Sequence, residues 1–243
     1  MKIYVVGLGP GDPDEMTPRA LKALELSDLI VGYTVYIDLI KDQFAHKKML
    51  TTPMKREVER CQIAVDEALK GQTVSMVCSG DAGVYGMAGI MHEVAKEYPI
   101  EIEIVPGITA ACSAAAVLGA PLIHDFCVIS LSDLLTPWEK IEKRLIAVGE
   151  ADFVVCLYNP SSKKRSDYLK KACDLLLANK PPYTPCGYVR NIGRDGESKT
   201  LCTLAELRET SVDMFTTVII GNSETKIIKE ALVTPRGYMK NEA

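Results

Sequence analysis

The sequence predicts an α/β protein of two domains, with a mostly parallel sheet in the N-terminal domain and a mixed sheet in the C-terminal domain. Up to about residue 118, short apolar runs alternate with longer segments of helical period, which is typical of a parallel sheet wrapped by helices. Further along, GYVRNIG through SKTLCTL reads as two strands joined by a tight Gly-Arg-Asp-Gly turn, which indicates a mixed sheet. The segment GAPLIHD interrupts this rhythm, so we place the domains at residues 1–119 and 120–243.

Each expected element follows from an apolar run or a helix-start signal. Thr17 is expected to cap the first helix, because threonine accepts a bond from a free amide and Pro18 suits the first helical position. The N-terminal strands are expected at 2–7, 28–32, 73–78 and 101–105. The C-terminal domain is expected to hold strands at 126–131, 152–158, 185–190, 198–203 and 216–221, and helices at 137–148 and 163–178.

The charge and hydropathy pattern argues against some classes of partner. A net charge of -4 and a pI near 5.5 disfavour a nucleic-acid partner, because binding phosphates needs clustered Lys and Arg in surplus. No apolar stretch approaches the roughly 20 residues that cross a bilayer, and the apolar run at the N-terminus is too short for a signal peptide. We therefore expect a cytoplasmic protein with no membrane partner.

The cysteines give no sign of a metal or redox centre. There are eight, without a CxxC pair, so neither a zinc knuckle nor a thioredoxin-type motif is present, and we expect no bound metal. Several lie inside apolar runs such as VSMVCSG, where buried cysteine behaves as a small hydrophobic residue.

The glycine loop after the first strand is not a dinucleotide or ATP loop. Its pattern is GxGxG rather than GxGxxG, the helix begins only at Thr17, and Gly32 and Tyr33 stand where an acidic residue would close the second strand. What the loop offers is backbone that can approach a ligand closely, followed by the carboxylate of Asp12. That carboxylate suits a cationic ligand or proton transfer, or else it caps a turn before Pro13, and both readings stay open.

Two further strands end in similar turns. SGDAGVYG follows the third predicted strand, and VPGITA follows the fourth and runs into the small-residue helix AACSAAAVLGA. Parallel strands that each end in a glycine turn bring three such loops to one edge of a sheet, which favours a small-molecule crevice over a protein-binding face.

Taken together, VGLGPGD, SGDAGVYG, VPGITA and the C-terminal TTVIIGN resemble the tetrapyrrole methylase family. One departure is Ala82, where the family commonly has proline. HDFCVISLSDLLTPW, CLYNPSSKKR and VRNIGRDGE are similar to the branch of the family that methylates C17 of precorrin-3B or cobalt-factor III and contracts the macrocycle. The resemblance runs from residue 2 to about 236.

The resemblance implies a pair of α/β domains, usually forming a homodimer, with S-adenosylmethionine held between them and a tetrapyrrole as the substrate. Carried over position by position, it assigns the methyl donor to three loops and to strand ends of the C-terminal domain. These residues are Leu8, Gly9, Pro10, Gly80, Asp81, Val84, Tyr85, Thr109, Ala110, Leu157, Tyr158, Asn159, Tyr188 and Thr217.

The proposed reaction also needs groups that move protons and groups that hold a polycarboxylate. His124 beside Asp125 is suited to proton transfer near neutral pH, although a histidine at a domain junction can instead be structural. Arginine binds carboxylates through two parallel hydrogen bonds, which favours Arg190 as a substrate ligand. Ser130 and Ser132 are expected either to bind substrate or to satisfy a strand end. The candidate catalytic residues are therefore Asp12, His124 and Asp125.

Three alternatives remain from the sequence. A sibling methylase could act at C11, C20 or C2 of the corrin precursor, or on uroporphyrinogen. A protein of the same fold could hold a tetrapyrrole without turnover, although the intact VGLGPGD and SGD turns speak against this. Diphthine synthase shares the loops, but nothing else in the sequence points to a protein substrate.

Overall fold

The computed structural model describes residues 1–162 and 165–238, and the chain divides into two compact units, Met1–Ala110 and Ala111–Ala243. The division falls after Ala110, the first residue of helix α5 (Ala110–Leu118), so nearly all of this helix lies in the second unit, whereas the sequence placed the boundary at 119/120. The reason is packing: a Cβ on Gly187 would lie 2.7 Å from the Leu118 side chain, so α5 rests directly on the sheet of the second unit. The amide of Ala111 also donates to the Tyr158 hydroxyl in that sheet.

The first unit contains a five-stranded sheet in the order β3-β2-β4-β1-β5 in which all neighbours are parallel. This confirms the expected parallel sheet. The strands are β1 (Lys2–Gly7), β2 (Leu29–Tyr33), β3 (Lys48–Thr52), β4 (Thr73–Cys78) and β5 (Glu101–Val105). The sequence did not predict β3, because this edge strand is short, largely uncovered and lacks a continuous apolar run.

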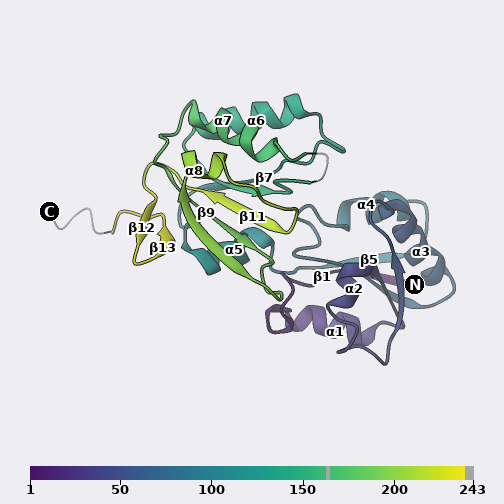
Figure 1. The fold of residues 1–243 in the computed structure, drawn as a ribbon. Helices are drawn as coiled ribbons and strands as arrows, with labels where there is room; N and C mark the ends of the chain where they lie inside the picture. The colour runs from purple at the N-terminus through teal and green to yellow at the C-terminus, as the bar shows by residue number, and fades with distance from the viewer. Residues whose placement is uncertain (163–164, 239–243) are drawn as a thin grey trace. The chain divides into compact units, whose positions relative to one another are not determined.

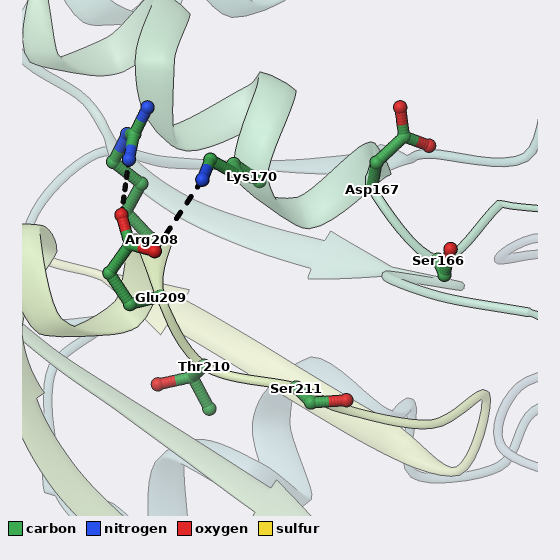
Figure 2. A pocket seen from close by; sticks show the side chains of 7 residues that line it. All are labelled: Ser166, Asp167, Lys170, Arg208, Glu209, Thr210 and Ser211. Carbon is green, nitrogen blue, oxygen red and sulfur yellow. Dashed lines mark hydrogen bonds and ion pairs between the residues drawn. The ribbon is translucent and has the colours of Figure 1, made fainter.

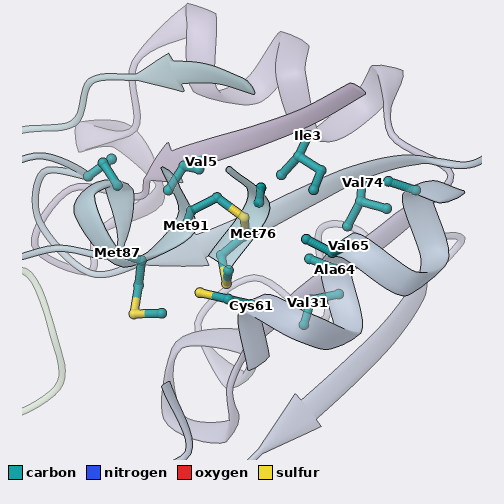
Figure 3. Packing of buried hydrophobic residues seen from close by; sticks show 14 of the residues in the cluster. Ile3, Val5, Val31, Cys61, Ala64, Val65, Val74, Met76, Met87 and Met91 are labelled. Atoms are coloured by element: carbon teal, nitrogen blue, oxygen red, sulfur yellow. The ribbon is translucent and has the colours of Figure 1, made fainter. Parts of the chain in front are cut away.

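Helices cover both faces of this sheet (Figure 1). On one face, α1 (Pro18–Leu26) and α2 (Thr34–Asp38) pack on Tyr4, Val6 and Ile30. On the other face, α3 (Glu57–Leu69) and α4 (Ala88–Ala95) close a second core around Val5 and Met76, which Figure 3 shows in close-up. Thr17 caps α1 as predicted, accepting the Ala20 amide at 3.1 Å.

The second unit contains a five-stranded mixed sheet in the order β10-β9-β11-β8-β7. Only β7 and β8 are parallel, and the remaining neighbours are antiparallel, so the predicted mixed sheet is confirmed. The strands are β7 (Phe126–Ser130), β8 (Val154–Tyr158), β9 (Pro185–Arg190), β10 (Ser198–Thr203) and β11 (Thr216–Ile220). Helices α6 (Trp138–Glu150), α7 (Tyr168–Leu177) and α8 (Leu204–Arg208) cover one face, and α5 lies on the other (Figure 1).

Two details of the second unit differ from the sequence prediction. The helix expected at 163–178 begins at Tyr168, and its first two predicted positions, Lys163 and Lys164, lie outside the described residues. A small three-stranded sheet, β12-β13-β6, was not predicted, because its strands have only two or three residues each. These strands are β6 (Gly119–Ala120), β12 (Lys226–Ile228) and β13 (Ala231–Val233).

Candidate active site

The loops that follow β1 and β4 are joined through their glycines. The amide of Gly9 donates to the carbonyl of Gly80 at 3.1 Å, and the amide of Gly80 donates back to the carbonyl of Gly9 at 2.7 Å. Both residues have positive φ angles, 78° and 69°, which glycine adopts without the penalty that a Cβ atom brings. The two loops are therefore held together by a pair of main-chain hydrogen bonds.

The loop after β5 packs against these two joined loops. A Cβ added to Gly107 would lie 2.2 Å from the Gly80 carbonyl oxygen, and one added to Gly7 would lie 2.6 Å from the same atom. Because these contacts are with main-chain atoms, no side chain can move away to relieve them. The predicted gathering of three strand-end loops at one sheet edge is confirmed.

Asp81 fastens this arrangement through its carboxylate. One oxygen, Oδ1, accepts the amides of Gly83 at 2.7 Å and Val84 at 3.1 Å, and Oδ2 accepts the Gly107 amide at 3.0 Å. The resemblance assigned Asp81 to binding of the methyl donor. In the structure its carboxylate connects the loop after β4 to the loop after β5. Oδ1 already accepts two amides, whereas Oδ2 accepts one and can take a second bond, and the predicted contact with a donor stays a prediction.

The other loop residues assigned to the donor differ in what they leave available. Leu8 is buried in the core beneath α1, and Pro10 is also buried. Val84 and Tyr85 are exposed, and Tyr85 has a φ of 53° that turns the chain at this point. Thr109 and Ala110 are half-buried at the end of the β5 loop. Val84 and Tyr85 are thus exposed at this edge, whereas Leu8 is not.

Asp12 caps a turn. Its Oδ1 accepts the Asp14 amide at 2.9 Å, at the start of the 3-10 helix η1 (Pro13–Glu15). The side chain is exposed. The turn-capping alternative is therefore what the structure shows for this residue, and a role in proton transfer stays a prediction.

His124 and Asp125 lie in the second unit, immediately before β7, and both are exposed. The main-chain carbonyl of Asp125 accepts the Val154 amide at 3.2 Å, which fixes the start of the strand. An exposed histidine carries no core-packing role, so the structural alternative for His124 finds no support in its burial.

The ends of β7 and β8 bring several predicted residues together. Asn159, with a φ of 51°, donates through Nδ2 to the Ser130 Oγ at 3.0 Å. The Tyr158 hydroxyl accepts the Ala111 amide at 2.6 Å, so it holds the first turn of α5. Ser132 donates its amide to Ser130 Oγ at 3.2 Å and accepts Arg165 Nη1 at 2.9 Å. Both serines take part in strand-end contacts, and their contact with a substrate stays a prediction.

The remaining residues assigned to the donor lie on opposite faces of the second sheet. Leu157 pairs with Val218, which in turn pairs with Tyr188, and this row belongs to the core under α6 and α7. Thr217, one position out of this row, points to the α5 side. The whole Leu157 residue is buried in an inner strand, so its contact with a donor stays a prediction.

Arg190 ends β9 and lies 3.3 Å through Nε from a carboxylate oxygen of Asp213, with both side chains partly exposed. The contact satisfies an ion-pair distance but lacks hydrogen-bond geometry, since Nε is a buried donor without a hydrogen-bond partner among the described residues. Arg190 therefore retains donors for a carboxylate ligand.

The sequence did not single out two sets of polar residues that the structure shows to be bonded or buried. Asp133 accepts Arg165 Nη1 at 3.1 Å and the Tyr168 hydroxyl at 2.7 Å, which ties the loop after β7 to the start of α7. The hydrogen bond from Tyr168, and then that from Arg165, lowers the pKa of the Asp133 carboxyl. Arg60 is buried on α3. The sequence did contain a sign of this burial. Residues 60, 61, 64, 65 and 68 form one buried stripe along the helix, and Arg60 is the charged residue in this otherwise apolar stripe.

An open cavity of about 250 Å³ in the second unit contains none of the predicted site residues. Three of its charged side chains interact with one another, as Figure 2 shows: Glu209 accepts from Arg208 and lies 3.5 Å from Lys170. Within residues 1–162 and 165–238, no group of three metal-binding side chains comes together, and no helix is long and apolar enough to cross a bilayer.

The chain belongs to a known family. Residues 2–208 match the Tetrapyrrole (Corrin/Porphyrin) Methylases. A probable cobalt-factor III C(17)-methyltransferase of Salmonella typhimurium is 48% identical over 97% of this chain and 99% of that protein. A precorrin-3B C(17)-methyltransferase of a Sinorhizobium species is 40% identical over 97% of this chain and 96% of that protein.

Solved structures of the same fold agree with this membership. The methyltransferase CobJ superposes with a TM-score of 0.89 at 36% identity and covers 96% of this chain and 99% of its own. A uroporphyrin-III C-methyl transferase from Thermus thermophilus, solved in complex with S-adenyl homocysteine, has a TM-score of 0.70 at 21% identity over 91% of this chain and 97% of its own. At that identity the second likeness supports the fold alone.

Proposed function

We propose that this protein transfers a methyl group from S-adenosylmethionine to C17 of precorrin-3B or cobalt-factor III and contracts the macrocycle, in cobalamin biosynthesis. The observation that carries the proposal is the 48% identity to a probable C17-methyltransferase across nearly the whole of both chains. The glycine-joined loops support it, because they form a close-approach backbone surface at the sheet edge where such folds bind ligands.

The donor, when bound, supplies an electrophilic methyl group on a sulfonium, so the protein mainly has to orient the two reactants. We assign donor binding to the main chain at Leu8, Gly9 and Gly80, and to the exposed Val84 and Tyr85. Leu157, at the end of the same strand as Tyr158, is also assigned to the donor. The other assigned residues are Pro10, Asp81, Thr109, Ala110, Tyr158, Asn159, Tyr188 and Thr217.

Ring contraction requires proton transfers that methylation alone does not. We assign these to the exposed His124 and Asp125, since imidazole changes protonation near neutral pH. Arg190 is the proposed ligand of a substrate carboxylate because its guanidinium is only loosely engaged by Asp213. Asp12, Ser130 and Ser132 have structural partners, and their proposed contacts would add to these. A homodimer and a cytoplasmic location stay predictions.

The test has two steps. Calorimetry with S-adenosylhomocysteine checks for a donor site, and absence of binding would favour a non-catalytic tetrapyrrole-binding protein. Cobalt-factor III and metal-free precorrin-3B are then offered side by side with the donor, and consumption of each is followed by absorbance and mass. Consumption of one of them supports the proposal. If neither is consumed while a different corrin precursor or uroporphyrinogen is, a sibling methylase activity replaces it.

A further inference from the structure

Arg60 is a buried arginine whose partners are all neutral. Only 3% of the residue is exposed. Its Nε donates to Thr52 Oγ1 at 2.8 Å and its Nη2 donates to the Pro53 carbonyl at 3.2 Å. Nη1 lies 3.8 Å from the Met87 sulfur, and the guanidinium carbon lies 5.9 Å from the centroid of the Tyr33 ring. A thioether is a weak acceptor, so this nitrogen is poorly satisfied.

No carboxylate within residues 1–162 and 165–238 forms an ion pair with Arg60. On its own helix, Glu59 pairs with Arg56 at 2.9 Å and Glu57 is exposed. The Asp81 carboxylate accepts loop amides instead. Arginine keeps its charge at all accessible pH values, and a buried charge is normally paired because removing it from water is unfavourable. The described residues therefore leave a buried positive charge without a counter-ion.

The position of this charge is the sheet edge that also carries the glycine loops. Tyr33 is the last residue of β2, Thr52 is the last of β3, and Met87 follows the β4 loop. In open parallel sheets this edge is where ligands bind. Burial raises the pKa of the Cys78 thiol to about 11, and both Asp81 and Arg60 act on that thiol electrostatically. The Arg60 guanidinium is thus close enough to Cys78, the last residue of β4, to interact with it electrostatically.

We propose that Arg60 binds a carboxylate of a ligand at this edge, exchanging its weak contact with the Met87 thioether for a charge-assisted hydrogen bond. The inference rests on the proposed function, whose reactants offer two sources of this group: the acid side chains of the macrocycle and the amino-acid carboxylate of the methyl donor. Methionine is flexible enough to move aside. The planar guanidinium carries five N–H groups, so donors remain after the bonds to Thr52 and Pro53.

The test compares Arg60→Met, Arg60→Lys and the control Arg144→Met, which changes an exposed arginine on α6. Calorimetry with S-adenosylhomocysteine and with its decarboxylated analogue reports on the donor, and the KM for the tetrapyrrole reports on the macrocycle. If Arg60 binds the donor carboxylate, Arg60→Met should lower the affinity for S-adenosylhomocysteine by about 10- to 100-fold and leave the affinity for the decarboxylated analogue unchanged. A macrocycle carboxylate predicts a similar rise in tetrapyrrole KM with unchanged S-adenosylhomocysteine affinity. Arg144→Met should behave as wild type.

A folded Arg60→Met protein with wild-type affinity for S-adenosylhomocysteine and wild-type KM for the tetrapyrrole overturns the proposal and leaves Arg60 a packing residue. If Arg60→Met does not fold, Arg60→Lys decides, because lysine keeps the charge and loses the planar fork. In Arg60→Lys, a several-fold loss of S-adenosylhomocysteine affinity or a several-fold rise in tetrapyrrole KM supports the proposal. Wild-type values for both overturn it. Failure of the proposed function is distinguishable, since the wild-type protein would then fail to bind the donor or to turn over the tetrapyrrole.

Discussion

Single glycines decide whether the loops of the first unit can meet. Gly107 and Gly89 form a matched pair, because a Cβ at 107 would meet main chain at 2.2 Å, whereas nothing lies within 4 Å of a Cβ at 89. We expect Gly107→Ala to lower the free energy of unfolding by about 1 to 3 kcal/mol and to weaken donor binding. Gly89→Ala, in helix α4, should be neutral or stabilise by up to about 1 kcal/mol. Urea unfolding measures both, and equal stability of the two variants would contradict the close approach.

His124 tests the proton-transfer assignment. Because the side chain is exposed, His124→Gln should leave the free energy of unfolding within about 0.5 kcal/mol of wild type. Loss of a general acid-base group should slow turnover about 100- to 10,000-fold without changing S-adenosylhomocysteine affinity. Single-turnover rates and calorimetry separate the two quantities. An unchanged rate would assign the proton transfers to another residue.

Asp133 gives a prediction for acid stability. Its pKa in the folded protein is lowered from the usual 3.8, chiefly by the Tyr168 hydroxyl and then by Arg165. A carboxyl with a depressed folded pKa stabilises the fold above its unfolded pKa, and this contribution is lost as the pH falls through the folded value. The stability difference between wild type and Asp133→Asn should therefore be constant from neutral pH down to about 5 and shrink below about 4. Urea midpoints across pH measure it, and a difference that does not change with pH would contradict the shift.

At the level of the elements, the five-stranded sheets were predicted wherever an apolar run marked a strand, and the strands without such a run were missed. The loops after β1, β4 and β5 were placed correctly because the carboxyl ends of parallel strands share an edge. The edge strand β3 has little apolar character, so its sequence carried no strand signal. The sequence did not reveal that α5 packs on the second sheet, because these contacts join it to residues far along the chain that no local pattern shows.

The contact between Tyr158 and α5 is one such long-range feature, joining residues 47 positions apart. Tyr158→Phe removes the acceptor of the Ala111 amide while preserving the ring. We expect the free energy of unfolding to fall by about 0.5 to 1.5 kcal/mol, the usual net value of one hydrogen bond. The sheet control Tyr4→Phe, whose ring lies in the first unit, should not alter hydrogen exchange at Ala111. Unchanged exchange at Ala111 in Tyr158→Phe would show that the bond does not hold the helix start.

At the scale of the whole molecule, each unit contributes a different part of the proposed chemistry. The first unit supplies the glycine-joined loops and the buried charge of Arg60, and the second supplies the exposed His124 and the loosely paired Arg190. The fold class, the loops and the family were all accessible from the sequence, because long motifs carried them. For Asp12 and Ser132 the sequence left a structural and a functional role open, and it did not show the amide partners of Asp81, because local spacing does not say whether a polar side chain is already bonded within the fold.

C17 methylation with ring contraction is tested most directly with S-adenosylmethionine carrying a ¹³C-labelled methyl group, incubated with the protein and the accepted macrocycle. Carbon NMR of the product then locates the label. We expect a single labelled methyl on C17 of a ring-contracted product, formed by wild-type protein and by Arg144→Met alike. A label at any other carbon, or on C17 of a macrocycle that keeps its original ring size, would contradict it.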